Sequence, residues 1–467
     1  MVKDNEKNKI TSNGMEKIVS LCKRRGFVFQ GSEIYGGFAG TYDWGHLGVA
    51  LKRNVTDAWN KAMQNHHNMT FLDSSIFTSG KVWEASGHVS GFSDPLVICN
   101  KCKEKFRADH LLESIGVKAD EKLSELEINK IFDENRTKIK CPKCDNKDFG
   151  KVRATSLLAT SNLGMLEETD GQVYLRGETA QGIYINYKNV LDTGFVSIPF
   201  GIAQIGKAFR NEISPRQFLF RKREFEQMEM QYFCHPNNAM DIYESWKSER
   251  MEYYKKMGIN PKKLRFKPHE NLVFYAKAAC DIEYEFPFGW SELEGIHYRG
   301  DYDLTQHQKF SGRDMRFYDE ETKEKYIPHI VETSVGVDRT ILMILCDAYR
   351  EDKLGEAERV VLKLPQKLAP VICAVSPLLK NKPELVEYAN TKVYAPLKAE
   401  FGRVAWDDNG NIGKRYRRQD EIGTPFCIVV DFDTLTDNSV TVRDRDTGEQ
   451  TRIKIEELKN YIKERIS

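Results

Sequence analysis

The segment FRNEISPRQFLFRKREFEQMEM, residues 209–230, decides how the surrounding sequence should fold. Charged and aromatic residues alternate in it with a period of two, whereas a solvated helix face would repeat every 3.6 residues. The two ends of the segment therefore predict neighbouring antiparallel strands. The middle of the segment contains Pro215, which fits a loop and not a central strand.

The polar residues of these two strands predict either a ligand pocket or a solvated surface. If residues 202–212 form a strand, Arg210 and Glu212 project from the same face of it. On the return strand, Phe225, Gln227 and Glu229 also share one face. An arginine fork suits phosphate, and a phenylalanine ring offers a stacking surface to a purine. A salt-bridged amphipathic hairpin explains the same alternation, because exposed polar faces are common in antiparallel sheets.

Outward from this hairpin, strand-like sequence extends over residues 173–233 and returns over 272–299. Helices are expected at residues 44–63, where apolar side chains fall on one face, and at 237–259 and 336–352. Strand and helix patterns alternate after residue 365 for about 100 residues, which predicts a separate doubly wound α/β module.

Composition excludes several classes of protein. The 467 residues carry a net charge of +1, so a nucleic-acid surface would have to be a local patch. The N-terminus has no apolar signal region, and no apolar run reaches the roughly 18 to 20 residues that span a bilayer. We therefore expect a cytoplasmic protein whose ten cysteines are thiols or metal ligands, not disulfides.

Two further segments combine carboxylates with arginines. The segment VETSVGVDRTILMIL, residues 331–345, predicts a strand end followed by a helix that begins at Gly336. Arg339 lies in the first turn of that helix, against the preference of the helix dipole, and this predicts either a phosphate contact or a surface arginine. Elsewhere, Glu292 and Arg299 form either a structural ion pair or part of a Mg²⁺ site.

Two C-x2-C pairs predict a zinc site. They are CNKC, residues 99–102, and CPKC, residues 141–144, with a helix expected between them over residues 119–135. Four thiolates suit tetrahedral Zn²⁺ and close its coordination, so the ion would be structural and not catalytic. Four free thiols in a loop are the alternative. The ten histidines show no spacing that predicts a metal or catalytic set.

The order of these motifs resembles a known family. FRNE with REFEQMEMQYF is similar to motif 2 of the class II aminoacyl-tRNA synthetases, and GVDR is similar to motif 3. SGHVSGFSDPL, FRADHL, RGETAQGIYINYKN and ETSVGVDR resemble the homodimeric glycine-specific members, and the resemblance runs from Arg25 to the C-terminus. The chain departs from the family pattern at Gly177, where proline is usual, and motif 1 lacks its usual proline.

The resemblance implies an α+β fold in which helices flank the antiparallel sheet of class II synthetases. It also implies a zinc-knuckle-like insertion and a C-terminal α/β anticodon-binding domain. The expected domains are the N-terminal part of the catalytic domain with the dimerisation region, residues 1–98; the insertion, 99–150; the catalytic core with motifs 2 and 3, 151–362; and the anticodon-binding domain, 363–467.

The activity that the resemblance implies is ATP-dependent attachment of glycine to its tRNA through glycyl-adenylate, by a homodimer that uses Mg²⁺. The implied catalytic residues are Arg210, Arg339 and Glu292. The implied ATP-binding residues are Arg210, Asn211, Glu212, Phe220, Arg221, Phe225, Glu292, Leu293, Gly336 and Arg339. The implied glycine-binding residues are Arg107, Glu178, Gln227, Glu229, Arg299, Glu332 and Ser334. The zinc ligands, which the two C-x2-C pairs and not the resemblance predict, are Cys99, Cys102, Cys141 and Cys144.

Individual roles follow from the same resemblance. Arg210 would contact the α-phosphate and the glycine carboxylate, and Glu212 the adenine amino group. Phe225 would stack on adenine, with Arg339 on the other face of the base, while Arg221 would hold the β- and γ-phosphates. The basic run of residues 414–418 would meet the anticodon, although on charge alone it fits a solvated loop.

Two other functions fit part of the sequence. A class II synthetase for another small amino acid would share the ATP site and differ in the amino-acid pocket. A non-catalytic RNA-binding relative would be expected to lose the ATP-binding arginines, yet Arg210, Arg221 and Arg339 are all present.

Overall fold

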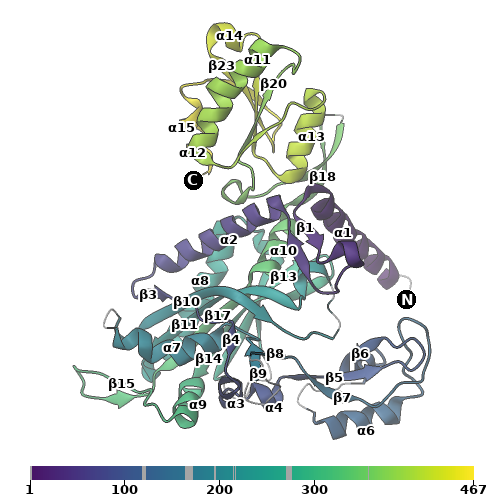
Figure 1. Ribbon diagram of the computed structural model, residues 1–467, viewed down its shortest axis with the longest axis vertical. Helices are drawn as coiled ribbons and strands as arrows, with labels where there is room; N and C mark the ends of the chain where they lie inside the picture. Colours follow the sequence, from purple (N-terminus) through teal and green to yellow (C-terminus); the bar gives the residue numbers. More distant parts are fainter. Residues whose placement is uncertain are drawn as a thin grey trace.

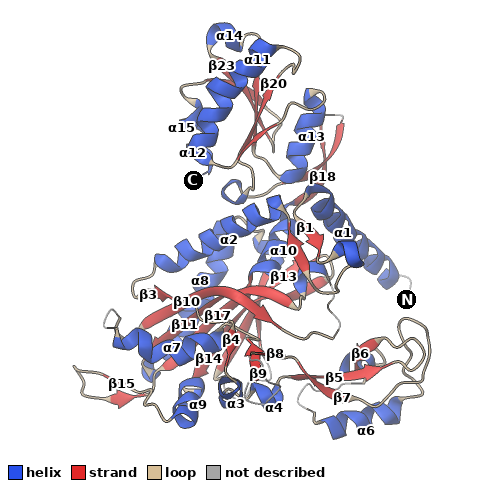
Figure 2. Cartoon of the chain, viewed as in Figure 1, coloured by secondary structure: helices blue, strands red, loops and turns tan. Residues whose placement is uncertain are grey.

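A computed structural model describes residues 3–117, 123–163, 172–193, 196–213, 215, 217–269, 276–355 and 357–466, without the side chains of 3–13 and 172. The chain forms a large central sheet with helices on it, a small module inserted beside that sheet, and a C-terminal α/β domain (Figures 1 and 2). Within these described ranges no helix has the length and apolar character needed to span a bilayer.

The central sheet has seven strands in the part of the chain that is described, in the order β12-β13-β14-β17-β11-β10-β3. Every neighbouring pair is antiparallel except β10 and β3. The strands are β3 (Met69–Phe71), β10 (Phe200–Phe209), β11 (Glu224–Cys234), β12 (Leu264–Pro268), β13 (Ala278–Phe286), β14 (Gly289–Gly300) and β17 (His329–Gly336).

The predicted hairpin is confirmed, with Ala208 of β10 opposite Phe225 of β11. Strand β10 is shorter than the 202–212 range considered, because it ends at Phe209. Arg210 then forms an isolated bridge with Leu158, so Arg210 and Glu212 lie beyond the regular strand. The strands expected over residues 272–299 are β13 and β14, and residues 272–275 lie outside the described residues.

The uniform strand character expected over residues 173–233 is wrong, because helix α7 (Ala180–Asp192) lies inside that range. Its buried residues Ala180, Ile183, Tyr184 and Tyr187 repeat with helical spacing. Because this buried face mixes small and aromatic side chains, a short stretch of the sequence does not show the helical period clearly. The helix expected over 336–352 is likewise shorter.

Helix α10 (Val337–Ala348) ends where strand β18 (Tyr349–Leu354) begins, and β18 forms a hairpin with β19 (Ala357–Leu362). The other expected helices are α2 (His46–Gln64) and α8 (Ala239–Met257). The remaining elements of this part are α1 (Lys3–Arg25), β1 (Val28–Gln30), β2 (Tyr42–Trp44), β4 (Phe77–Thr78), α3 (Gly80–Ala85), α4 (His88–Gly91), β8 (Ala159–Asn162), β9 (Gln172–Leu175), α9 (Tyr302–Ser311), β15 (Phe317–Tyr318) and β16 (Lys325–Tyr326).

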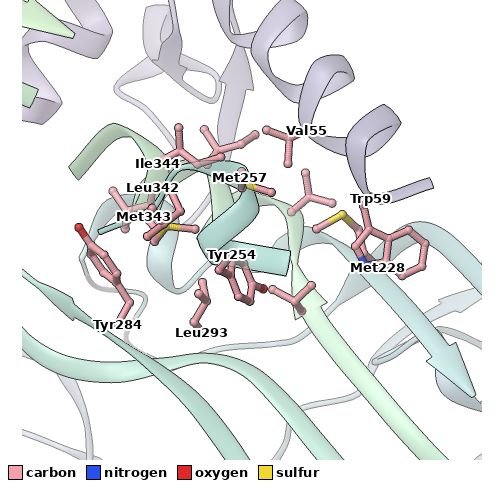
Figure 3. Close-up of a cluster of buried hydrophobic side chains, with 14 of the residues drawn as sticks. Val55, Trp59, Met228, Tyr254, Met257, Tyr284, Leu293, Leu342, Met343 and Ile344 are labelled. Carbon is pink, nitrogen blue, oxygen red and sulfur yellow. The ribbon is translucent and has the colours of Figure 1, made fainter. Parts of the chain in front are cut away.

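The main hydrophobic core lies between one face of the central sheet and helices α2, α8 and α10 (Figure 3). Val55 and Trp59 of α2 are fully buried there, one turn apart, with Met228 of β11 beside them. Tyr254 of α8 and Leu342 of α10 belong to the same cluster. Because side chains alternate along a strand, the opposite face of β11 is free to carry polar groups.

The inserted module has its own small core. Its sheet is β5 (Ser93–Ile98), β6 (Lys105–Arg107) and β7 (Arg153–Ser156), and its helices are α5 (Ala108–Glu113) and α6 (Glu125–Asn135). Val97, Phe106 and Phe132 are buried together in a cluster separate from the main core. Of the helix expected over 119–135, residues 119–122 lie outside the described residues.

The C-terminal domain has a five-stranded sheet in the order β21-β20-β22-β23-β24. The first three strands are parallel, as predicted, but β23 pairs antiparallel with both β22 and β24. A tight turn at Gly448 joins β23 to β24. Its elements are β20 (Cys373–Pro377), α11 (Pro383–Tyr388), a π-helical turn (Ala389–Tyr394), α12 (Ala395–Phe401), β21 (Val404–Trp406), α13 (Ile412–Ile422), β22 (Phe426–Val430), α14 (Thr434–Asp437), β23 (Ser439–Asp444), β24 (Gln450–Lys454) and α15 (Leu458–Ile466).

Candidate active site

A cavity of about 290 Å³ lies on the polar face of the central sheet. Most of the predicted site residues line it, although they are spread over more than 160 positions of the sequence. Those residues are Glu178, Arg210, Glu212, Phe220, Arg221, Phe225, Gln227, Glu229, Glu292, Leu293, Arg299, Glu332, Ser334, Gly336 and Arg339.

Arg210 is fixed between two aromatic rings. Its guanidinium carbon lies 5.2 Å from the ring centre of Phe92 and 5.3 Å from that of Phe225. Its Nε donates a hydrogen bond of 3.0 Å to the carbonyl of Gly177. These contacts hold the guanidinium at the cavity wall, where it can meet an anion without first being ordered.

Arg339 and Glu292 form a second charged pair on the cavity wall. Arg339 Nη1 lies 2.9 Å from Glu292 Oε1, and the guanidinium carbon lies 4.4 Å from the ring centre of Phe220. The positive charge of Arg339 lowers the pKa of Glu292, against the effect of burial. About half of the Glu292 side chain is exposed, so its carboxylate remains open to a ligand.

Sequence reasoning missed a buried pair that joins the hairpin to helix α10. Lys222 Nζ lies 2.6 Å from Asp338 Oδ1, and Asp338 Oδ2 accepts a hydrogen bond from the backbone of Glu226. Both charged side chains are almost fully buried. The pair fixes the return strand against the helix that carries Arg339. Only the adjacency of Asp338 to Arg339 in the sequence could have suggested it.

The far end of the cavity is rich in carboxylates. Glu229 Oε2 accepts hydrogen bonds from the hydroxyls of Ser334 at 2.8 Å and Thr179 at 3.1 Å. Gln231 Nε2 bridges Glu229 and Glu332, at 2.8 and 3.1 Å. Strand pairing explains this proximity, because Gln231 of β11 lies opposite Glu332 of β17.

The pKa values of the three carboxylates at this end are shifted in different directions. Burial and the neighbouring Glu332 raise the pKa of Glu229 well above its usual value. Burial would also raise the pKa of Glu332, but the positive charge of Arg299 and the hydrogen bond with His297 outweigh it. They hold the Glu332 pKa well below the usual range. Likewise, His88 and Arg299 overcome burial and hold the pKa of Glu178 at about 2. A cation entering here would favour the ionised form of all three carboxylates.

Arg299 organises this acidic end. It donates to Asp303 through Nε at 2.8 Å and Nη2 at 3.0 Å, and its Nη1 reaches Glu332 at 2.9 Å. A two-pronged contact with Asp303 fixes the plane of the guanidinium. Asp303 lies in helix α9, so this helix indirectly positions Glu332.

His297 is a further cavity residue that the sequence patterns did not suggest. Its Nδ1 lies 3.0 Å from Glu332 Oε2. This contact with Glu332 raises the pKa of His297, although burial acts in the opposite direction. The histidine is in the same strand as Glu292 and Arg299, and only the pairing of β14 with β17 brings it to Glu332.

Two of the predicted ATP- and glycine-binding residues are not among those that line the cavity. Asn211 follows the end of β10 and donates its backbone N–H to Leu157. Arg107 is at the end of β6 in the inserted module, where it pairs with Asp94 and Asp109. Their roles in ATP and glycine binding stay predictions.

The four cysteines of the inserted module come together as the sequence predicts. The sulfur of Cys99 lies 3.7 Å from that of Cys144, and the sulfur of Cys102 lies 3.6 Å from that of Cys141. A tetrahedron with zinc–sulfur bonds of 2.3 Å has edges of about 3.8 Å. All four sulfurs lie within 4.8 Å of one another, so their positions fit one Zn²⁺ ion.

The basic run of residues 414–418 is not a solvated loop but part of helix α13. Arg415 is buried and donates to backbone carbonyls, including Pro377, while Arg418 pairs with Asp407. Lys414 and Arg417 remain at the wall of a shallow groove that Arg25 of helix α1 also lines. Folding within the domain therefore uses part of the predicted basic patch.

Comparisons with known proteins agree with this architecture. The tRNA synthetase class II core domain (G, H, P, S and T) matches residues 165–348, and an anticodon binding domain matches residues 372–465. A solved prolyl-tRNA synthetase from Cryptosporidium parvum shares the fold, with a TM-score of 0.64 at 16% identity over 96% of this chain and 74% of that one.

Curated relatives extend over almost the full chain. The glycine--tRNA ligase of Clostridium acetobutylicum is 49% identical, over 97% of this chain and 98% of the relative. The enzyme of the same name from Borreliella burgdorferi is also 49% identical, over 97% of each chain. With this identity over nearly its whole length, the chain belongs to the glycine--tRNA ligase family of class II tRNA synthetases.

Proposed function

We propose that the cavity on the central sheet activates glycine with ATP and passes it to tRNA. The glycine carboxylate attacks the α-phosphorus of ATP, and pyrophosphate leaves. A ribose hydroxyl of the tRNA end then attacks the carbonyl of the adenylate and loses its proton, and AMP leaves. No side-chain nucleophile is needed, so the protein acts through positioning and charge. The observation that supports this proposal most directly is that one cavity combines arginines held by other side chains with a cluster of carboxylates.

The arginine end of the cavity is suited to ATP. Arg210, held between Phe92 and Phe225, would stabilise the charge that develops on the α-phosphate. Phe225 would stack on adenine, and Arg339 would cover the other face of the base. Arg221, whose Nη1 lies 3.7 Å from Glu212 Oε2, would turn toward the β- and γ-phosphates. Glu212 would then accept a hydrogen bond from the adenine amino group.

Mg²⁺ accompanies ATP in class II synthetases, and Glu292 would hold it here. The carboxylate is ionised and half exposed, and a hard cation prefers such oxygen ligands together with phosphate oxygens. Mg²⁺ supplies charge neutralisation at the phosphates. The protein's own part is to keep Glu292 ionised beside Arg339.

The carboxylate end is suited to the ammonium group of glycine. Glu178, Glu229 and Glu332 provide negative charge, and Ser334 bonds Glu229 at 2.8 Å. The Ser334 hydroxyl would occupy the space that the methyl of alanine needs. A site that excludes a larger side chain by contact needs no separate editing step.

Exchange of labelled pyrophosphate into ATP tests this function. We expect exchange with glycine and not with alanine or serine, and a loss on the order of 10²- to 10³-fold in Arg210→Ala. Arg316→Ala is the matched control, because this exposed arginine pairs with Asp314 two residues away and should keep full exchange. Exchange with alanine or serine in place of glycine would refute the assignment of the pocket.

The four cysteines support a structural Zn²⁺ ion in the inserted module. Each C-x2-C pair is followed by a residue with positive φ, Lys103 at 59° and Asp145 at 56°. The backbone N–H of each donates to the carbonyl of the first cysteine of its pair, Cys99 or Cys141, at 2.9 Å. Two hairpins of the same geometry thus present their sulfurs to one point, and the ion would tie them together.

Three further features stay proposals. The division into these domains is supported by separate buried clusters in the inserted module and the C-terminal domain, although the sheet of the module extends beyond 99–150 to residues 93–156. A homodimer is supported by exposed apolar side chains, with Ile34 87% and Tyr35 86% exposed. Sedimentation at several protein concentrations would test the dimer. The cytoplasmic location stays a prediction.

A further inference from the structure

Among the described residues, a second group of possible metal ligands lies outside the cysteine module. It consists of His269, Asp281 and His297. A ring nitrogen of each histidine and a carboxylate oxygen of Asp281 lie within 4.8 Å of one another. The rings of the two histidines have centroids 5.7 Å apart, nearly edge to face.

The register of the central sheet creates this group. The backbone N–H of His269, just after β12, donates to the carbonyl of Ala279 in β13 at 3.1 Å. On the other side of β13, Ala279 lies opposite His297 of β14. The two histidines therefore flank a small alanine side chain. Asp281 lies two residues further along β13 and shares the face of Ala279.

A glycine makes room for the His297 ring. Gly295 lies opposite Asp281 and on the same face as His297. A Cβ at Gly295 would come within 2.9 Å of His297 Cε1 and 3.3 Å of Nε2. The imidazole thus fills the space that any other residue at 295 would occupy, and this position places it beside Asp281.

The hydrogen bonds around the group orient its donors. His297 Nδ1 contacts Glu332 at 3.0 Å, which leaves Nε2 as the ring nitrogen able to bind an ion. A carboxylate behind a ligating histidine is the usual support of a metal-bound imidazole. His269 Nε2 lies 2.9 Å from Asp281 Oδ2, so two of the three atoms that would bind the ion already lie close together.

The surroundings favour a cation at this point. Asp281 contributes one carboxylate to the group, and a second carboxylate, Glu332, lies behind His297. The three side chains are partly exposed, between 15% and 32%, so an ion can reach them from solvent. His297 also lines the catalytic cavity, which places the group at the cavity's edge.

We propose that His269, Asp281 and His297 bind one divalent ion of the zinc class at the edge of the catalytic cavity. Two imidazoles and one carboxylate suit Zn²⁺, Co²⁺ or Ni²⁺, whereas Mg²⁺ prefers oxygen ligands alone. Three protein ligands leave one coordination position open. The site is distinct from the cysteine module, and it does not depend on the proposed function of the cavity.

Cobalt binding tests the site directly. The full chain is stripped with a chelator, supplied with one equivalent of Zn²⁺ for the four cysteines, and then titrated with Co²⁺ while its visible spectrum is recorded. We expect a second ion per chain, with d–d bands of a nitrogen and oxygen environment. It should lack the near-ultraviolet sulfur-to-cobalt charge-transfer band that a cysteine site gives.

Variants assign the ion to the group. We expect Co²⁺ affinity to fall at least about tenfold in His269→Gln and in Asp281→Asn. His235→Gln is the matched control, because His235 also faces a carboxylate, Glu324, at 3.5 Å but lies outside the group. Circular dichroism verifies that each variant is folded. A chain that takes up only the cysteine-bound ion, or a second ion retained in both variants, would overturn the proposal.

Discussion

The inserted module and the catalytic cavity both gather polar and ionisable side chains, but they do so in opposite ways. In the module, each cysteine pair spans four residues, and a local hairpin sets its geometry. In the cavity, the charged groups come from β11, β14, β17, the hairpin loop, the start of α10 and the segment just before α7. The geometry of the cysteine site therefore depends on residues adjacent in the sequence, whereas the geometry of the cavity depends on the register of the strands that form it.

The largest effect is expected from breaking the local site. Cys141→Ser, or removal of metal by a chelator, should unfold the module, because its core is small and metal binding supplies about 10 to 16 kcal/mol in comparable zinc modules. Limited proteolysis should then cut within residues 97–152 while the central sheet stays protected. Cys280→Ser, a buried cysteine of the main core, is the control and should leave the module resistant.

The pH dependence of glycine binding probes the cavity's charges. The pKa of Glu229 is raised, so near and below that pKa the free protein holds a proton that the ammonium of glycine must displace. Glu332 and Glu178 face the same point with lowered pKa values and stay ionised. The KM for glycine should therefore fall as pH rises, by up to about tenfold per unit below the Glu229 pKa.

A calorimetric measurement in two buffers of different ionisation enthalpy would count the proton released on glycine binding. Glu229→Gln should abolish that release. A KM for glycine that rises with pH over this range, with the protein folded throughout, would contradict the protonation state assigned to Glu229.

A smaller effect should follow from a change to strand packing that removes no charged group. Gly295→Ala places a methyl group 2.9 Å from the His297 ring, which the bond to Glu332 holds in place. Overpacking of this kind costs about 1 to 3 kcal/mol. We expect Co²⁺ affinity at the His269, Asp281 and His297 group to fall about tenfold. Gly91→Ala is the control, because its Cβ position has no described atom within 4 Å and, as at Gly295, the backbone φ is not positive.

The smallest effect is expected from one hydrogen bond. Ser334→Ala removes the hydroxyl that bonds Glu229 at 2.8 Å, at a cost of about 1 kcal/mol, or roughly a fivefold higher KM for glycine. The same change should let alanine support measurable pyrophosphate exchange, because the pocket gains room. If the variant rejects alanine as fully as the unchanged protein, Ser334 is not the residue that excludes it.

Much of the fold could be predicted from the sequence. The hairpin of β10 and β11, helix α2 and the parallel strands of the C-terminal domain have clear apolar periods. The sequence pattern does not reveal helix α7, because its buried face mixes alanine with tyrosine, and the same kind of pattern predicts a helix where β18 begins. In both places the packing of neighbouring elements decided the outcome, and a short window of sequence does not contain that information.

The sequence by itself determined what short-range spacing can encode. The cysteine knuckles, the order of the synthetase motifs and the charged residues of the hairpin are all visible in it, because hairpins and helix starts depend on a few adjacent residues. Only the tertiary structure decided which charges meet. Lys222 reaches Asp338, and His269 reaches Asp281 and His297, because strand register brings distant residues to one face of the sheet.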